Sequence, residues 1–193
     1  MWKLNMVNGV LFTGGWAKTR LYYDTVKAIF KKVLVKNDAG DHFPLYAICL
    51  GFELLTVIIT EDKSILKEFD AADQASTLKF MRNTNIEGTV FQSMASRQRL
   101  MQNTDLTNFF KVLTTSMDGD NKKNAFEWCL SMTPHSDDAI QVTQHVANFF
   151  VSEARKSVNQ AFAWKVLDNL IYNYSPMYCG KAGNGYDVVY IFT

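Results

Sequence analysis

The stretch Phe43-Pro44-Leu45-Tyr46-Ala47-Ile48-Cys49-Leu50-Gly51-Phe52-Glu53-Leu54-Leu55 decides the fold of this chain. It predicts a short buried strand over residues 45–48, a cysteine at the turn, and an apolar helix from Phe52 to about Thr60. Small residues two positions before and two positions after the cysteine are typical of a nucleophile elbow, in which a strained turn between strand and helix pushes the nucleophile outward. A helix N-terminus also favours a thiolate. The alternative is a buried structural cysteine, and the small neighbours favour the nucleophile.

A glycine turn precedes this stretch. The apolar run from Val7 to Phe12 predicts a buried strand, and Thr13-Gly14-Gly15 predicts a tight turn after it. Because glycine lets a backbone N–H approach a reacting carbonyl closely, the turn is either an oxyanion loop or an ordinary strand-to-loop connection.

The segment from Tyr22 to Lys36 predicts an amphipathic helix that ends at Asn37-Asp38-Ala39-Gly40. Its lysines lie mostly on one face and are expected to be solvated. The opposite, apolar face is formed by Tyr22, Val26, Ile29, Phe30, Val33 and Leu34. Together with the two strands, this helix predicts a βαβ unit in a parallel sheet.

Later segments predict shorter elements. Strands are expected over 78–80, 89–91, 109–116 and 186–192, and the longest amphipathic helix over 139–156. The stripe expected to be buried on that helix consists of Val142, Val146, Phe149, Phe150 and Ala154.

Composition excludes several classes of protein. Twenty Lys and Arg residues against nineteen Asp and Glu leave a net charge of +1, which indicates neither nucleic-acid binding nor a polybasic membrane surface. No apolar run approaches the ~18 residues of a membrane span. Three cysteines without metal-ligand spacing indicate neither a disulfide framework nor a zinc site. The N-terminus, Met-Trp-Lys-Leu-Asn-Met, does not read as a signal peptide.

Several separated motifs resemble one family. The segment 47–55 is similar to the nucleophile motif of gamma-glutamyl hydrolases, folate-processing members of the class I glutamine amidotransferase-like superfamily. Further blocks of that family are similar to residues 8–15 and 151–156 and to the ending over 174–178 and 190–192. The sequence of these blocks is most similar to plant members. The resemblance implies an α/β, flavodoxin-like three-layer fold with a mostly parallel central sheet. It covers 1–193 as a single, incomplete domain.

The resemblance also implies the chemistry. The family hydrolyses gamma-glutamyl bonds of folylpoly-gamma-glutamates as a cysteine omega peptidase, in the vacuole or outside the cell. It needs no cofactor or metal and binds neither nucleic acid nor membrane, and a homodimer is left open. Cys49 would be the nucleophile, and N–H groups of Gly14 or Gly15 and of Leu50 would hold the oxyanion. Glu53 belongs to the motif, and its alternative role is to cap the elbow helix or to pair with a loop cation.

Such an enzyme needs a base beside the thiol, and the three histidines are poorly placed for that role. His42 precedes the elbow strand and should lie at its opposite end. His145 flanks the apolar stripe of the long helix. His135, in a polar loop before that helix, is the one plausible substitute, although helix capping by Ser136 or Asp137 also explains this loop.

Two blocks of the family are broken in this chain. The family's catalytic histidine lies in a Gln-Trp-His-Pro-Glu-Lys block, ahead of a segment similar to 123–128, but here Asp120-Asn121-Lys122 leads directly into that segment. A His-His-Tyr-Gly block is replaced by Thr104-Asp105-Leu106, and the family's first strand upstream of Trp2 is missing.

Three hypotheses follow. The first is a working gamma-glutamyl hydrolase. The second is an inactive homologue or fragment that binds polyglutamate or a partner protein, which the missing histidine favours for this particular chain. A glutaminase-type amidotransferase subunit shares the elbow but fits the chain's ending less well.

Overall fold

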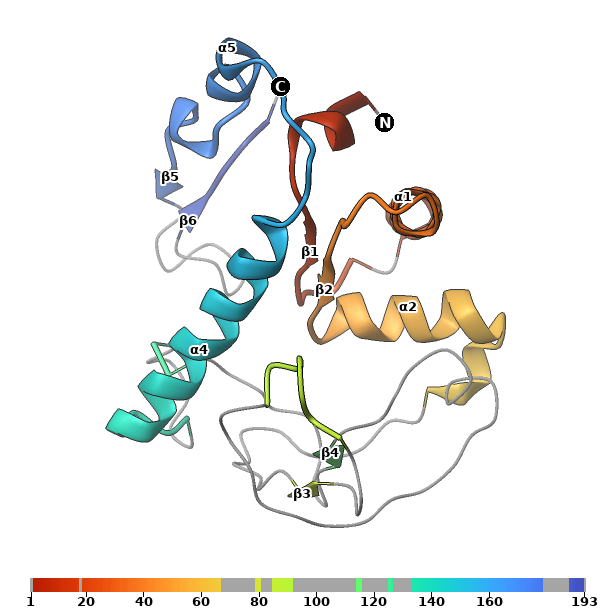
Figure 1. Cartoon of the computed structure of the whole chain (residues 1–193), viewed down its shortest axis with the longest axis vertical. Coiled ribbons are helices and arrows are strands. Elements are labelled where there is room, and N and C mark those ends of the chain that lie inside the picture. Colours follow the sequence, from red (N-terminus) through yellow and green to blue (C-terminus); the bar gives the residue numbers. More distant parts are fainter. Residues whose placement is uncertain are drawn as a thin grey trace. The chain divides into compact units, whose positions relative to one another are not determined.

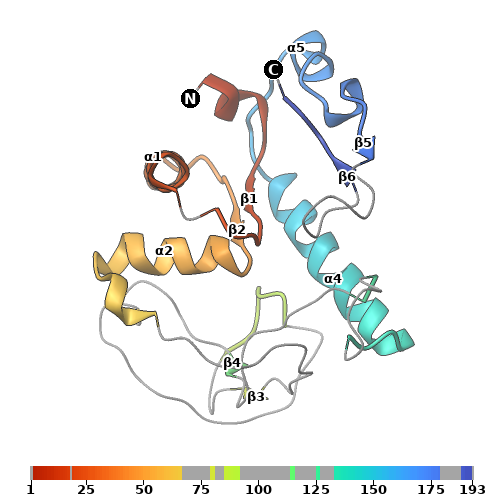
Figure 2. The same ribbon diagram turned by 180° about the vertical axis from the view of Figure 1, so that it is seen from behind.

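The computed structural model describes residues 2–17, 19–66, 79–80, 85–91, 114–115, 125–126, 133–178 and 188–192 (Figures 1 and 2). Contacts divide the chain into two compact units. One unit is the single segment Gly9–Ser157, and the other joins Met1–Asn8 to Val158–Thr193. The single domain expected from the sequence stays a prediction.

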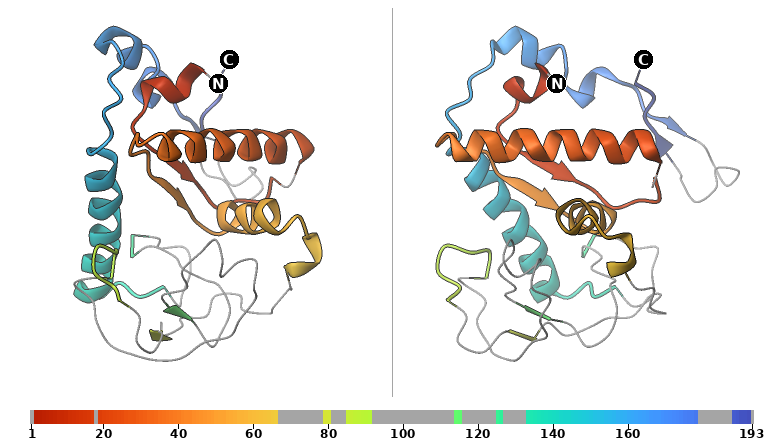
Figure 3. Two further views of the ribbon diagram at one scale, coloured as in Figure 1. Left: turned by 45° about the vertical axis from the view of Figure 1, so that its right-hand side comes forward. Right: turned by 90° about the vertical axis from the view of Figure 1, so that its right-hand side faces the viewer.

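The βαβ unit predicted from the sequence is confirmed. Strands β1 (Val10–Phe12) and β2 (Leu45–Ala47) pair in parallel. Helix α1 (Arg20–Asp38) connects them, and α2 (Leu50–Thr60) begins directly after the cysteine turn (Figure 3). Thr19 caps α1, because its hydroxyl accepts a hydrogen bond from the Tyr22 N–H at 3.4 Å.

The core of this unit lies between the two strands and the helices α1 and α2. Its buried members are Phe12, Val26, Phe30, Leu50, Leu54, Leu55 and Ile58. The apolar face predicted for α1 is confirmed, since its six side chains are buried or half-buried. The solvated lysine face is confirmed at Lys31 and Lys32, whereas Lys27 and Lys36 are half-buried. The Lys36 Nζ lies 2.6 Å from the Asp41 carboxylate.

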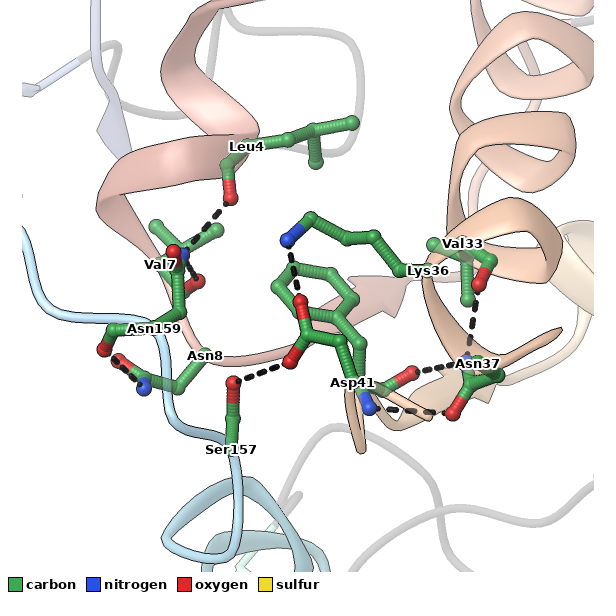
Figure 4. A network of polar contacts seen from close by, with 10 residues as sticks. Leu4, Val7, Asn8, Val33, Lys36, Asn37, Asp41, Ser157 and Asn159 are labelled. Carbon is green, nitrogen blue, oxygen red and sulfur yellow. Dashed lines mark hydrogen bonds and ion pairs between the residues drawn. The ribbon is translucent and has the colours of Figure 1, made fainter. Parts of the chain in front are cut away.

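Asn37 ties the end of α1 to the segment that leads into β2 (Figure 4). Its side-chain amide donates to the carbonyl oxygens of Val33 at 2.9 Å and Phe43 at 2.8 Å, and its carbonyl accepts from the Phe43 N–H at 3.1 Å. Phe43 is fully buried. A single side chain therefore satisfies both backbone groups of a buried residue.

Replacing this side chain should be costly. Asn37→Ala is expected to lower the free energy of unfolding by about 2–3 kcal/mol, because a buried N–H and C=O lose their partners. Thr25→Ala is the matched control on the same helix, since the Thr25 hydroxyl is exposed and bonds only within α1. We expect the control to change stability by less than about 0.5 kcal/mol. Urea unfolding followed by circular dichroism measures both, and equal stabilities would contradict the role of Asn37.

Helix α4 (Asp137–Ala154) begins at Ser136, whose hydroxyl accepts from the Ala139 N–H at 3.3 Å. It lies on the opposite side of the strands from α1 and α2 (Figure 1), where its Phe150 ring is 5.9 Å from the ring of Tyr46. The burial predicted for its apolar stripe is confirmed only in part: Val146, Phe149, Phe150 and Ala154 are half-buried, none of them is fully buried, and Val142 is 39% exposed. The two paired strands β1 and β2 offer too narrow a surface to cover a helix of this length.

The short strands agree only partly with the sequence. Strand β3 (Lys79–Phe80) pairs antiparallel with β4 (Thr114–Thr115), inside two of the predicted ranges, and the rest of those ranges lies outside the described residues. The strand predicted over 89–91 is wrong. Those residues form a turn, because the Thr89 hydroxyl donates to the Ile86 carbonyl at 2.6 Å and accepts from the Phe91 N–H at 3.2 Å. Local side-chain bonds of this kind compete with strand pairing.

The connection after α2 contains the 3-10 helix η2 (Lys63–Ile65). Among the described strand pairs, β1 and β2 are parallel and the other two pairs are antiparallel. Of the mostly parallel sheet that was predicted, the described residues therefore contain two strands. In the described part of the chain, no helix combines the length and the apolarity that crossing a membrane requires.

The second unit is held together around Asn159. It contains η1 (Trp2–Met6), α5 (Ala163–Leu167) and η3 (Ile171–Asn173), and β5 (Met177–Tyr178) pairs antiparallel with β6 (Val188–Val189). The Asn159 amide donates to the carbonyls of Leu4 at 3.2 Å and Val7 at 2.7 Å, and the Asn8 amide donates to the Asn159 carbonyl at 2.9 Å (Figure 4). The strand predicted over 186–192 is confirmed at 188–189; 190–192 are not part of a strand, and 186–187 lie outside the described residues.

Candidate active site

Cys49 occupies the strained turn that the sequence predicts. It is the N-cap of α2, with φ 51° and ψ −119°, and it is exposed. A residue with a side chain rarely adopts this conformation, which costs about 1–3 kcal/mol and persists only where the surroundings enforce it. Here the Ile48 N–H donates to the Phe12 carbonyl at 2.9 Å, and the Gly51 N–H donates to the Ile48 carbonyl at 2.9 Å. The elbow geometry is therefore confirmed.

Gly51 allows α2 to start against β1. A Cβ at this position would lie 2.5 Å from the Phe12 carbonyl oxygen and 2.6 Å from the Phe12 Cβ. Real Cβ atoms do not approach other atoms so closely, so only glycine fits. The part played by Phe12, whose carbonyl also holds the turn through Ile48, was not predicted from the sequence. The small residue at position 51 was the only signal for it.

The glycine turn after β1 lies against the thiol. A Cβ at Gly14 would be 3.2 Å from the Cys49 Cβ and 3.5 Å from its Sγ, and one at Gly15 would be 3.9 Å from the Leu50 Cδ2. Gly15 has a φ of 145°. Leu50 begins α2, so its backbone N–H has no acceptor within its own helix. The structure thus brings together the four predicted residues, and their roles in catalysis stay predictions.

Glu53 lies in the first turn of α2, where its backbone N–H donates to the Cys49 carbonyl at 3.0 Å. One oxygen of its carboxylate is shielded from solvent. A negative charge in the first turn of a helix is stabilised by the helix dipole. The roles considered for Glu53, a part in the site, a cap for the helix or a partner for a loop cation, stay predictions.

The histidines contact groups other than the thiol. His42 lies ahead of β2, at the opposite end from Cys49 as predicted, and its Nε2 is 3.0 Å from a Glu153 carboxylate oxygen. Glu153 also accepts from Lys156 at 2.6 Å, and this hydrogen bond is the main cause that holds the pKa of Glu153 below its ordinary value. The Nε2 of His145 is 2.9 Å from the Val90 carbonyl.

His135 is half-buried, with its Nδ1 2.8 Å from the Ala125 carbonyl oxygen. A carbonyl can only accept, so Nδ1 carries the hydrogen, and in the neutral ring Nε2 is then the basic nitrogen. The loop around it is explained by Ser136 as helix cap. A catalytic role for His135 stays a prediction.

Within the described ranges, no three His, Cys, Asp or Glu side chains are grouped so that they could hold a metal ion.

Comparison with known proteins identifies the family. No protein-family model matches the chain. Gamma-glutamyl hydrolase 2 of Arabidopsis thaliana is 51% identical over 99% of this chain and 67% of its own length. The gamma-glutamyl hydrolase of Glycine max is 44% identical over 98% of this chain and 68% of its own length. This chain belongs to the gamma-glutamyl hydrolase family. The resemblance read from the sequence is confirmed, and by family the protein is a hydrolase.

The similarity of this gamma-glutamyl hydrolase family member to more distant relatives is lower. The Homo sapiens gamma-glutamyl hydrolase is 29% identical over 96% of this chain. The family implies a glutamine amidotransferase-like α/β fold, of which the β1-α1-β2-α2 unit is a recognisable part. The alignment with the first Arabidopsis relative runs over 233 residues, 40 more than the 193 of this chain, so at least 40 positions of that relative have no counterpart here.

Proposed function

We propose that Cys49 is the nucleophile of a hydrolase that cleaves gamma-glutamyl bonds in folylpoly-gamma-glutamates, and that this chain performs the reaction poorly. The observation that supports the nucleophile is the exposed cysteine at positive φ, with Gly14 against its thiol, in a chain whose relatives are named gamma-glutamyl hydrolase. The relatives' names support a gamma-glutamyl bond as the one that is cleaved. The folate part of the proposed substrate rests on the resemblance alone.

The reaction proceeds through a thioester. The Cys49 thiolate attacks the γ-carbonyl carbon, a C–S bond forms, and the carbonyl electron pair moves onto oxygen. The N–H groups of Leu50 and of Gly14 or Gly15 donate to that oxyanion. When the carbonyl re-forms, the C–N bond breaks and the leaving amine takes up a proton. Water then attacks the thioester, which releases the γ-carboxylate and returns the thiol.

One group must take the proton of the Cys49 thiol and give it to the leaving amine, and must then take a proton from the attacking water and return it to the thiolate, so it acts in turn as base and acid. The block that would supply this group is proposed to be absent. The contacts of His42, His135 and His145 with groups other than the thiol support this proposal. The proposal is also supported by the at least 40 positions of the Arabidopsis relative that have no counterpart in this chain. The same observations favour the second candidate, an inactive homologue or fragment that binds polyglutamate or a partner protein. We further propose a vacuolar or extracellular location, with dimerisation left open.

Trapping the thioester tests the proposed nucleophile. The purified chain is mixed with pteroyl-tri-γ-glutamate, quenched in acid and digested. Mass spectrometry is expected to find the acyl group on Cys49, and Cys49→Ser is expected to abolish both adduct and product. Product formation that survives Cys49→Ser would remove Cys49 from the reaction. Release of ammonia from glutamine without cleavage of the folate would instead favour the glutaminase alternative.

Brief alkylation gives an independent prediction. Cys49 is exposed at the N-terminus of α2, and a helix N-terminus stabilises negative charge. We therefore expect iodoacetamide to label Cys49 before Cys129 and Cys179, as followed by mass spectrometry of the digested chain. Equal labelling of the three thiols in the native chain, with the same result in urea, would argue against the elbow.

A further inference from the structure

The turn between β1 and α1, whose Gly14 lies against the candidate nucleophile, also carries an exposed tryptophan. Residues 13–17 follow the carboxyl end of β1 and are all exposed. Trp16 exposes 88% of its surface, which is unusual for so large an apolar side chain. Ligands of parallel α/β sheets bind outside the carboxyl ends of the strands. Trp16 therefore lies at the end of the sheet where a substrate of Cys49 must bind.

Chain length limits how far Trp16 can lie from the reacting sulfur. The site of a Cβ on Gly14 is 3.5 Å from the Cys49 Sγ. Gly14 and Trp16 are two residues apart, so their Cα atoms are separated by at most about 7 Å, and the Trp16 side chain starts within roughly 12 Å of the sulfur. Gly14 and Gly15 place no side chain between them. A group bound a few bonds away from the cleaved amide can thus contact the indole.

We propose that Trp16 stacks on the aromatic pteroyl end of a folylpoly-γ-glutamate and so selects folates over other γ-glutamyl peptides. This inference rests on the proposed function and names the part of the substrate that the turn recognises. An exposed indole gains by stacking on a planar aromatic group, and such contacts change affinity by up to about tenfold. The polyglutamate tail consists of amides, carboxylates and short methylene stretches and has no aromatic ring, so it offers an indole no comparable planar surface.

Ligand binding tests the assignment. The full chain carrying Cys49→Ser is used so that the ligand is not consumed, and equilibrium dialysis measures Kd for pteroyl-tri-γ-glutamate and for tri-γ-glutamate. Adding Trp16→Ala is expected to raise the Kd for pteroyl-tri-γ-glutamate about tenfold and to leave the Kd for tri-γ-glutamate unchanged. Trp16→Phe should retain most of the affinity. Val35→Ala, which removes a 62% exposed side chain near the other end of α1, should change neither Kd.

The outcomes separate the two proposals. Unchanged binding of the pteroyl ligand by Trp16→Ala overturns the role of Trp16 and leaves the proposed function intact. An equal loss for both ligands also overturns the aromatic selection. If the Cys49→Ser chain binds neither ligand, the proposed function fails and this inference with it. A thermal unfolding curve for each variant shows that an exposed position has been changed without loss of the fold.

Discussion

Gly51→Ala is expected to lower the free energy of unfolding of the elbow unit by about 2–3 kcal/mol. The added Cβ would lie 2.5 Å from the Phe12 carbonyl oxygen and 2.8 Å from its carbonyl carbon. The obstacle is backbone in a paired strand, so relief requires α2 to move away from the core that Leu50 and Leu54 fill. Such overpacking typically costs 1–3 kcal/mol or more, which outweighs the roughly 1 kcal/mol that alanine gains over glycine in a helix.

Gly14→Ala is the matched control for this prediction. Its Cβ would meet the Cys49 Cβ at 3.2 Å, a contact that a shift of a few tenths of an ångström relieves. We expect its effect on stability to stay below about 1 kcal/mol, as measured by urea unfolding of both variants. A Gly51→Ala chain as stable as the parent would show that α2 does not start against β1 as described.

Hydrolysis of a γ-glutamyl peptide by this chain is expected to be at least about 100-fold slower than by a plant relative, because catalytic groups act as a unit. The comparison is kcat/KM measured side by side with Arabidopsis gamma-glutamyl hydrolase 2. A kcat/KM within about tenfold of that of the relative would contradict the proposal that the base is missing and would indicate that His135 acts as the base. In that event His135→Gln should abolish the activity.

A chimaera provides the positive control for the missing base. Inserting the relative's histidine-containing block between Lys122 and Lys123 is expected to raise kcat by more than about tenfold, provided that thermal unfolding shows a folded chain. The same insertion with its histidine replaced by alanine should give no gain. A gain that is independent of that histidine would mean that the block acts by stabilising the fold.

The elbow could be predicted because its cause is local. A strand, small residues around Cys49 and an apolar helix are all visible in consecutive residues, and the structure has each of them. The helix α1 was predictable for the same reason, since its apolar spacing faces a single core.

The missed features depend on contacts that sequence spacing does not encode. The hydroxyl of Thr89 makes local bonds that replace a strand, although β-branched residues favour strands. Burial of the α4 stripe depends on how much sheet lies beneath it, which periodicity along one helix cannot reveal. The tight approach of Phe12 to Gly51 joins two segments far apart in the chain.

The unit around Asn159 is built from two segments that the chain connects only through Gly9–Ser157. While that long stretch is folded, its two ends are held in place. The bonds from Asn159 to Leu4 and Val7 then form without a further loss of conformational entropy, because folding of the stretch has already ordered the chain between them. Unfolding of the stretch would restore that freedom, and re-closing an unfolded loop of this length costs about 4 kcal/mol. The three hydrogen bonds between Asn159 and the segment 4–8, worth about 1 kcal/mol each, do not offset that cost. Damage to the elbow should therefore also release the N-terminal segment, whereas loss of the Asn159 contacts leaves the elbow closed.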